Sequence, residues 1–340
     1  MHKRSADALD LGKTSSADFQ YAASLNDKTD SDENGQSKIM QPTANFRGAI
    51  FMCLAMAGFT CNDALIKSVT GVMNAGQIML VRGFFTSVLV LLLARHFGAL
   101  RSFRLIRSPI IALRIAAEVG ASISYIYALG QIPLANASAI LQALPLAVTL
   151  GAALFLGEPV GWRRWVAILV GFAGVLIVLR PGPEGFNGAA LSVVASVVFA
   201  AIRDLCTRRI DPAIPSLFIS VITATVITLT GAILIVPLGG WQPMSMASIG
   251  ILAAASLLLL VGYQCIVLAM RNGEIAIVAP FRYTSLLWSI SIGILFFSEE
   301  PDIWMVTGVA IIIASGLYTF ARENKRRMAL AQRSEPGSPK

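Results

Sequence analysis

Charged residues are scarce in this chain of 340 residues: 14% are Asp, Glu, Lys or Arg, whereas 56% are hydrophobic. About a quarter of the residues in a soluble domain are charged, so this composition excludes an ordinary soluble protein. Histidine occurs only as His2 and His96, and the four cysteines form no C-x-x-C pair. These scarcities argue against a zinc site and against a disulfide framework.

The phosphate-binding loop G-x-x-x-x-G-K-[ST] is also missing, which excludes ATP as a direct energy source. No histidine falls within a long apolar run, so the usual catalytic centres of an intramembrane enzyme are absent. A carboxylate pair drawn from Asp63, Glu118 and Asp204 stays open, as does a receptor or scaffold role. We expect no enzyme activity and no cofactor.

Long apolar runs fill most of the chain, and the mean hydropathy is +0.71. A bilayer core about 30 Å thick requires roughly 20 apolar residues for each helix that crosses it. The sequence therefore predicts an all-α polytopic membrane protein. Ten membrane-spanning helices are expected, at residues 47–67, 76–94, 108–129, 134–156, 162–179, 188–209, 214–236, 247–270, 275–297 and 302–320.

Basic residues predict the orientation in the membrane, because Lys and Arg concentrate in cytoplasmic loops. With the N-terminus inside, the outer loops keep only Lys67 and Arg180. Both termini are thus expected in the cytoplasm, and the net charge of +8 is assigned to the membrane surface rather than to nucleic acid. Residues 1–45 are expected to be a disordered cytoplasmic tail, with Met40 as an alternative start, and residues 322–340 a basic one.

An internal repeat recurs after about 141 residues. The stretch "DALIK" at 63–67 is echoed by "DLCTR" at 204–208, and "GEPVGW" at 157–162 is echoed by "EEPDIW" at 299–304. Each copy contains five expected spans, so the second copy enters the membrane from the opposite side. Residues 46–180 and 188–321 are therefore predicted to be two inverted five-helix repeats, an architecture typical of secondary transporters.

The repeated Glu-Pro turns and the Gly-rich spans after them, "GEPVGWRRWVAILVGFAGVLIVLRPG" and "SEEPDIWMVTGVAIIIASGLYTF", resemble EamA-type members of the drug/metabolite transporter superfamily. The resemblance implies a carrier of a small organic metabolite in the bacterial inner membrane. The stretches "VRGFF", "ALGQIPLANASAI" and "RDLCTRRI" resemble carriers of riboflavin and S-adenosylmethionine. Riboflavin uptake is favoured; export of amino acids, drugs or related metabolites, or S-adenosylmethionine transport, is the alternative. Proton coupling stays open.

Ionisable side chains within predicted spans are candidate functional residues, because each must face a partner or a wet cavity. Arg114 and Glu118 share a helix face at i, i+4. They form either a buried pair that fixes helix packing or a site where Glu118 contacts substrate or a proton. Arg82 and Arg282 either extend to the interface or attract polar groups into a cavity.

Two acid–base pairs recur at the repeat spacing. Asp63 is expected to pair with Lys67, and Asp204 with Arg208, by the i, i+4 rule. Inversion places one pair near each membrane face, where they act as helix-end contacts or as gates. Arg203 points about 100° away from Asp204 and is not expected to share its face.

Prolines within two spans predict helix breaks, Pro145 in the fourth and Pro280 in the ninth. Polar groups near broken helices are typical of transporter binding sites, although each break is also explained by a packing kink. The residues expected to bind substrate, besides Glu118 and Arg282, are Tyr125, Gln142, Tyr283 and Trp288. The rings are expected either to stack on a flat heterocycle or to contact lipid.

Small residues are expected to allow close helix packing in the fifth and tenth spans. They are also a possible homodimer face. These residues are Ala167, Gly171 and Gly174 in the fifth span and Ala310, Ala314 and Gly316 in the tenth.

Overall fold

The computed structural model describes residues 44–100, 108–158, 161–180, 188–211 and 213–334. The predicted N-terminal tail, apart from its last two residues, lies outside this described part. Every regular element in the described part is helical. The elements are Ala44–Val69, α2 (Ala75–His96), α3 (Pro109–Leu129), α4 (Leu134–Leu141), α5 (Leu144–Phe155), α6 (Trp162–Leu179), α7 (Gly188–Arg208), α8 (Ser216–Ile235), α9 (Met246–Asn272), α10 (Ile275–Val278), η2 (Ala279–Tyr283), α11 (Thr284–Phe297) and α12 (Ile303–Ser334).

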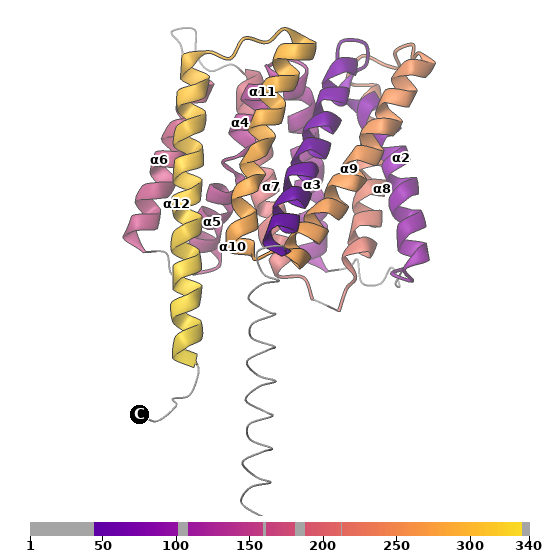
Figure 1. The fold of residues 1–340 in the computed structure, drawn as a ribbon. Helices are drawn as coiled ribbons and strands as arrows, with labels where there is room; N and C mark the ends of the chain where they lie inside the picture. Colours follow the sequence, from indigo (N-terminus) through magenta and orange to yellow (C-terminus); the bar gives the residue numbers. More distant parts are fainter. Residues whose placement is uncertain (1–43, 101–107, 159–160, 181–187, 212, 335–340) are drawn as a thin grey trace, which may run out of the picture.

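The chain is a polytopic membrane protein, as predicted. Nine helical segments of the described part are long and apolar enough to cross a membrane, and they include Leu134–Phe155, which holds both α4 and α5. The predicted span at 275–297 is divided among α10, η2 and α11. In Figure 1 the long helices run roughly parallel to one another, and α12 extends beyond the bundle at the end where Ala44 lies. We call this end the terminal end and the other the opposite end.

Polar caps fix where several helices begin. The Asn74 side chain accepts a hydrogen bond from the backbone N–H of Gln77 at the start of α2, at 2.9 Å. Asp302 accepts one from the Met305 N–H at the start of α12, at 2.8 Å. Such caps satisfy backbone donors that the first helical turn leaves free.

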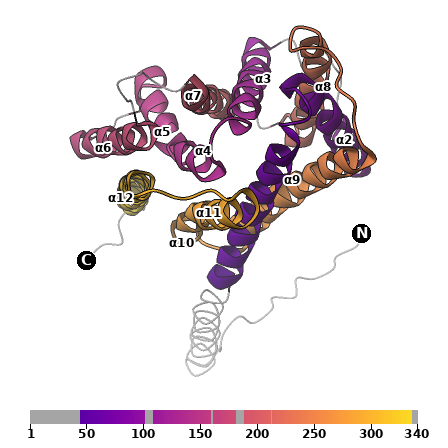
Figure 2. The ribbon, with the colours of Figure 1, turned by 90° about the horizontal axis from the view of Figure 1, so that it is seen from above.

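Each half of the chain packs mainly against the other half. α2 packs along α8, α3 along α7 and α6 along α12. Seen from above, these helices lie side by side around the bundle (Figure 2). The pairing of second with seventh and fifth with tenth span is the one expected of an inverted repeat.

The fourth crossing is broken and its first part is deeply buried. Leu134, Ala137 and Ile140 of α4 are at most 1% exposed. The helix stops at Leu141 and restarts as α5 at Leu144, one residue before Pro145. In the second half Pro280 is the second residue of the 3₁₀ turn η2 between α10 and α11. Both prolines thus lie at helix breaks.

The small residues of α6 and α12 bring these two helices into close contact. A Cβ added to Gly174 would lie 2.9 Å from the carbonyl oxygen of Gly308, and one added to Gly308 would lie 2.7 Å from that of Gly174. The Ser315 hydroxyl donates to the Ala167 carbonyl across the same interface. The face of α6 that holds Gly174 is therefore covered within the chain, and a homodimer through it stays a prediction.

Gly174→Ala should lower the apparent melting temperature of the purified protein by several degrees, because its new methyl group meets backbone that cannot yield without moving a helix. Overpacking of this kind costs about 1–3 kcal/mol. Gly250→Ala is the matched control, since a Cβ there meets nothing within 4 Å. Thermal unfolding in detergent would measure both variants, and equal melting temperatures would contradict the close α6–α12 contact.

The last helix continues beyond the membrane span that the sequence predicted. α12 continues to Ser334, whereas the sequence predicted that the span ends at 320 and a basic tail begins at 322. The membrane-spanning part is Ile303–Arg322. The remaining helix is rich in Lys and Arg and needs no apolar surroundings to form, because such long side chains favour helix.

Candidate functional site

A charged cluster joins α3 to α7 inside the bundle. The Arg203 guanidinium lies 3.1 Å from one oxygen of Glu118, and Arg114 lies 3.8 Å from the other. Arg203 also lies 2.9 Å from Asp204. The predicted pairing of Arg114 with Glu118 is confirmed. Arg203 and Asp204 were expected to lie on different helix faces, and their side chains nevertheless meet, because the long arginine side chain turns back toward its neighbour.

The Glu118 side chain is only 18% exposed, and the side chains of Arg114 and Arg203 beside it are 14% and 21% exposed. Arg114 also donates to the hydroxyl groups of Thr207 and Thr223, at 3.2 and 2.8 Å. A carboxylate in poorly solvated surroundings is stabilised by such neighbours, and removing one charge would leave the others unbalanced.

Asp63 and Tyr125 form a second polar group, between the first helix and α3. The Tyr125 hydroxyl donates to Asp63 at 2.8 Å, and the side-chain amide of Asn62 donates to the other oxygen at 2.8 Å. Two predicted site residues are therefore in direct contact. Asn62, 3% exposed, was not predicted, although an amide next to an acid within a predicted span is itself a signal.

Arg82 of α2 lies near both groups without a direct partner. It interacts electrostatically with Asp63, Tyr125 and Glu118. Its Nε is buried and has no hydrogen-bond partner among the described residues. This places the guanidinium inside the polar region rather than at the interface, and leaves it a donor that a bound molecule can use.

Tyr263 of α9 is a residue that sequence reasoning missed. It is 52% exposed and lies within electrostatic range of Glu118, Arg203 and Arg82, and its ring packs edge-on against Phe59 at 5.2 Å between centroids. The signal in the sequence was the pair of polar side chains in "GYQC", in the middle of an apolar run. The polar region thus draws on the first helix, α2, α3, α7 and α9.

The two helix breaks meet each other. The side-chain amide of Gln142, between α4 and α5, donates to the Arg282 carbonyl at 3.3 Å and to the Ser285 hydroxyl. Tyr283 lies against Gly316 of α12, where an added Cβ would collide with its hydroxyl. The structure thus brings Gln142, Arg282 and Tyr283 together, and their part in binding stays a prediction.

The predicted aromatic residues are distributed over different surroundings. Tyr125 is engaged with Asp63, Tyr283 packs on α12, and Trp288 is 42% exposed. No ring contact joins these three among the described residues. Their stacking on a flat ligand stays a prediction.

The two predicted i, i+4 pairs are wrong. Lys67 pairs with Glu299 at 3.2 Å, not with Asp63, and Arg208 pairs with Glu158 at 3.4 Å, not with Asp204. Both basic side chains lie at helix ends, where a carboxylate from a neighbouring loop reaches them. The acids one turn earlier, Asp63 and Asp204, contact other side chains.

Lys67 and Glu299 are held by several further contacts. The Lys67 ammonium donates to the carbonyl of Leu129 at 3.3 Å and to that of Ile132. Glu299 accepts from the backbone N–H groups of Leu134 and Ala135, at 2.8 and 3.4 Å. The pair therefore ties the first helix, the start of α4 and the segment before α12 together.

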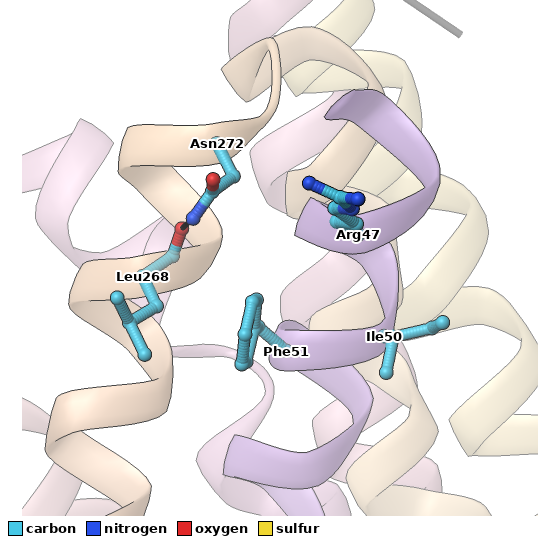
Figure 3. A pocket seen from close by; sticks show the side chains of 5 residues that line it. All are labelled: Arg47, Ile50, Phe51, Leu268 and Asn272. Atoms are coloured by element: carbon cyan, nitrogen blue, oxygen red, sulfur yellow. Dashed lines mark hydrogen bonds between the residues drawn. The ribbon is translucent and has the colours of Figure 1, made fainter. Parts of the chain in front are cut away.

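A surface pocket of about 430 Å³ lies apart from these groups, near the terminal end between the first helix and α9. Arg47, Ile50 and Phe51 of the first helix line it together with Leu268 and Asn272 of α9. Phe51 lies between the two helices, and Asn272 donates to the Leu268 carbonyl (Figure 3). It contains none of the predicted site residues. Nowhere in the described part do three or more His, Cys, Asp or Glu residues come together as metal ligands would.

The family model and the named relatives all indicate a membrane transporter. Residues 46–180 match the sequence model of the EamA-like transporter family. The chain is 30% identical to the pseudopaline exporter of Pseudomonas aeruginosa over 282 residues, covering 79% of this chain and 94% of that protein. It is 28% identical to a riboflavin transporter of Rhizobium johnstonii, covering 87% and 98%.

The chain is also 26% identical to an S-adenosylmethionine uptake transporter of Rickettsia bellii, covering 82% of this chain and 94% of that protein. A crystal structure described only as that of a protein superposes with a TM-score of 0.56 at 17% identity, covering 85% of this chain and 99% of the other. That likeness supports the fold.

Proposed function

The chain belongs to the EamA-like transporter family of the drug/metabolite transporter superfamily, and we propose that it is a secondary transporter of small zwitterionic metabolites. It acts in the bacterial inner membrane with both termini in the cytoplasm, and it works by alternating access. The Lys and Arg asymmetry of the loops supports this orientation.

The observation that carries the substrate class is the mixed charge of the polar region. Three carboxylates, of Asp63, Glu118 and Asp204, lie with three guanidinium groups, of Arg82, Arg114 and Arg203. Burying charge within a membrane protein is costly. A neutral substrate cannot form ion pairs with these side chains, so the buried charges contribute little to its binding. A zwitterion can, because its own carboxylate and cationic group replace the ion-pair partners that it displaces.

Two residues of the polar region suit the two charged groups of a zwitterion. Arg82, whose Nε has no partner, offers donors to a carboxylate. Asp63, which lies at the edge of the same region and accepts from Tyr125 and Asn62, offers an acceptor to a cationic group. S-adenosylmethionine has an α-amino carboxylate and a sulfonium, so it is the candidate that this arrangement supports best.

Riboflavin, which the sequence resemblance favoured, is neutral, so its binding depends mainly on ring stacking. The dispersed rings of Tyr125, Tyr283 and Trp288 give it less support. Its uptake stays a prediction, and riboflavin is the comparison substrate in the test.

Counterflow in proteoliposomes tests the substrate class without an assumption about direction. Vesicles are loaded with unlabelled S-adenosylmethionine and diluted into a trace of labelled S-adenosylmethionine; empty vesicles of the same lipid are the control. We expect saturable accumulation of label. S-adenosylhomocysteine, which keeps the amino-acid part, should compete, and methylthioadenosine, which lacks it, should not. Counterflow of riboflavin without counterflow of S-adenosylmethionine would reject the zwitterionic class.

A further inference from the structure

The two inter-half ion pairs occupy equivalent places in the repeat. Arg208 follows Lys67 by 141 positions. Glu158 and Glu299 belong to the two Glu-Pro turns that the repeat matches, in which Glu158 aligns with Glu300, the neighbour of Glu299. Each pair joins the end of the first helix of one half to the segment before the last helix of the other half. Inversion puts Lys67–Glu299 at the opposite end of the bundle and Arg208–Glu158 at the terminal end.

The two equivalent pairs differ in how tightly they are held. The side chains of Lys67 and Glu299 are 14% and 10% exposed. Those of Arg208 and Glu158 are both 51% exposed, and a single contact of 3.4 Å joins them. A solvent-exposed pair of this kind contributes about 0–1 kcal/mol, whereas a buried pair with additional hydrogen bonds resists separation.

The buried pair also holds the start of α4. Glu299 accepts from the first N–H groups of α4, and the other end of α4 leads into Gln142, which contacts the break of the second half. This short helix therefore connects Glu299 to the point where the two breaks meet.

We propose that these pairs are the two alternating gates of the transporter, an inference that rests on the proposed function. Lys67–Glu299 closes the opposite end in the conformation seen here. In the other conformation it separates, and Arg208–Glu158 becomes the buried pair that closes the terminal end.

The repeat spacing specifies the contacts of the second closed state. Leu129 and Ile132, whose carbonyls hold Lys67, correspond to Met270 and Gly273. Arg208 then donates to these two carbonyls. Glu158 accepts from the first backbone N–H groups of α10, as Glu299 does from those of α4.

Cross-linking tests the gates. The four cysteines are free thiols and are first replaced by alanine. Cysteine pairs are then introduced as Lys67→Cys with Glu299→Cys and as Arg208→Cys with Glu158→Cys, and treated with a short bifunctional thiol reagent. We expect the first pair to cross-link at least several-fold faster without substrate, and either cross-link to stop counterflow until it is reduced.

The matched control is Arg180→Cys with Asp302→Cys. These residues form an exposed ion pair of 2.6 Å between α6 and α12, which stay packed together in the proposed cycle. Their cross-link should leave counterflow unchanged. Counterflow that continues with both gate pairs cross-linked in separate variants would overturn the proposal.

A second measurement needs no substrate, so it separates failure of the gates from failure of the proposed function. Lys67→Met with Glu299→Gln, added to the Arg208→Cys and Glu158→Cys variant, weakens the opposite gate. The cross-linking rate at the terminal end should rise several-fold, because the population shifts toward its closed state. An unchanged rate would overturn the proposal even if transport had been measured with the right substrate.

Discussion

Counterflow should fall to the level of empty vesicles when Glu118 is replaced by glutamine. The substitution leaves Arg203 and Arg114 beside a neutral amide in poorly solvated surroundings, and Asp204 balances only one of them. Loss of one partner from a buried ion pair costs about 3–5 kcal/mol, so the melting temperature should fall as well. Initial counterflow rates and thermal unfolding in detergent would measure the two effects.

A double variant separates transport from folding. Glu118→Gln with Arg203→Gln removes both charges of the closest contact and should recover most of the melting temperature without restoring counterflow. Recovery of counterflow would show that the Glu118 carboxylate serves only to pair with Arg203 in the fold and takes no part in transport. Asp302→Asn is the matched surface control, because asparagine keeps the cap on Met305 while it removes an exposed charge; it should be close to the unmodified protein.

Replacing Arg82 by glutamine should lower counterflow at subsaturating substrate by about 10- to 100-fold. Hydrogen bonds to charged groups contribute about 1.5–3 kcal/mol, and each 1.4 kcal/mol is a factor of ten in affinity. The Nε of Arg82 has no hydrogen-bond partner among the described residues, so its loss should disturb the fold less than loss of Glu118. The effect should appear mainly as a higher half-saturation concentration.

Arg82→Lys is the matched control, since it keeps the charge and loses the planar donor group, and its effect should be intermediate. A substrate analogue without its carboxylate should be carried equally poorly by the unmodified protein and by Arg82→Gln. An unchanged half-saturation concentration in Arg82→Gln would remove Arg82 from the binding site.

Much of the fold could be predicted from the sequence, because a span needs only an apolar run of the right length. The crossings and both helix breaks follow from composition and from Pro145 and Pro280. The predicted end of the tenth span at 320 lies close to the end of the membrane-spanning part at Arg322. The further course of α12 was not predicted, since hydropathy marks where a helix leaves the bilayer and says nothing of whether it continues as a helix in water.

The candidate site was predicted less completely. Glu118 with Arg114 was found because both lie on one helix, where spacing determines proximity. The partners of Lys67 and Arg208 were missed because Glu299 and Glu158 reach them from loops of the other half. The spacing of residues along one helix does not predict contacts with a loop of the other half. The internal repeat does indicate them, when the acids and bases of one half are compared with those of the other.

The packing of each half against the other has a consequence for biosynthesis. α2, α3 and α6 are made first, yet their main partners α8, α7 and α12 belong to the second half. Glu299 emerges roughly 230 residues after Lys67, about 10–50 seconds later at the usual rate of synthesis. During that interval the five early helices lie in the bilayer without most of their helix contacts, so the nascent first half should be the stage most exposed to membrane quality control.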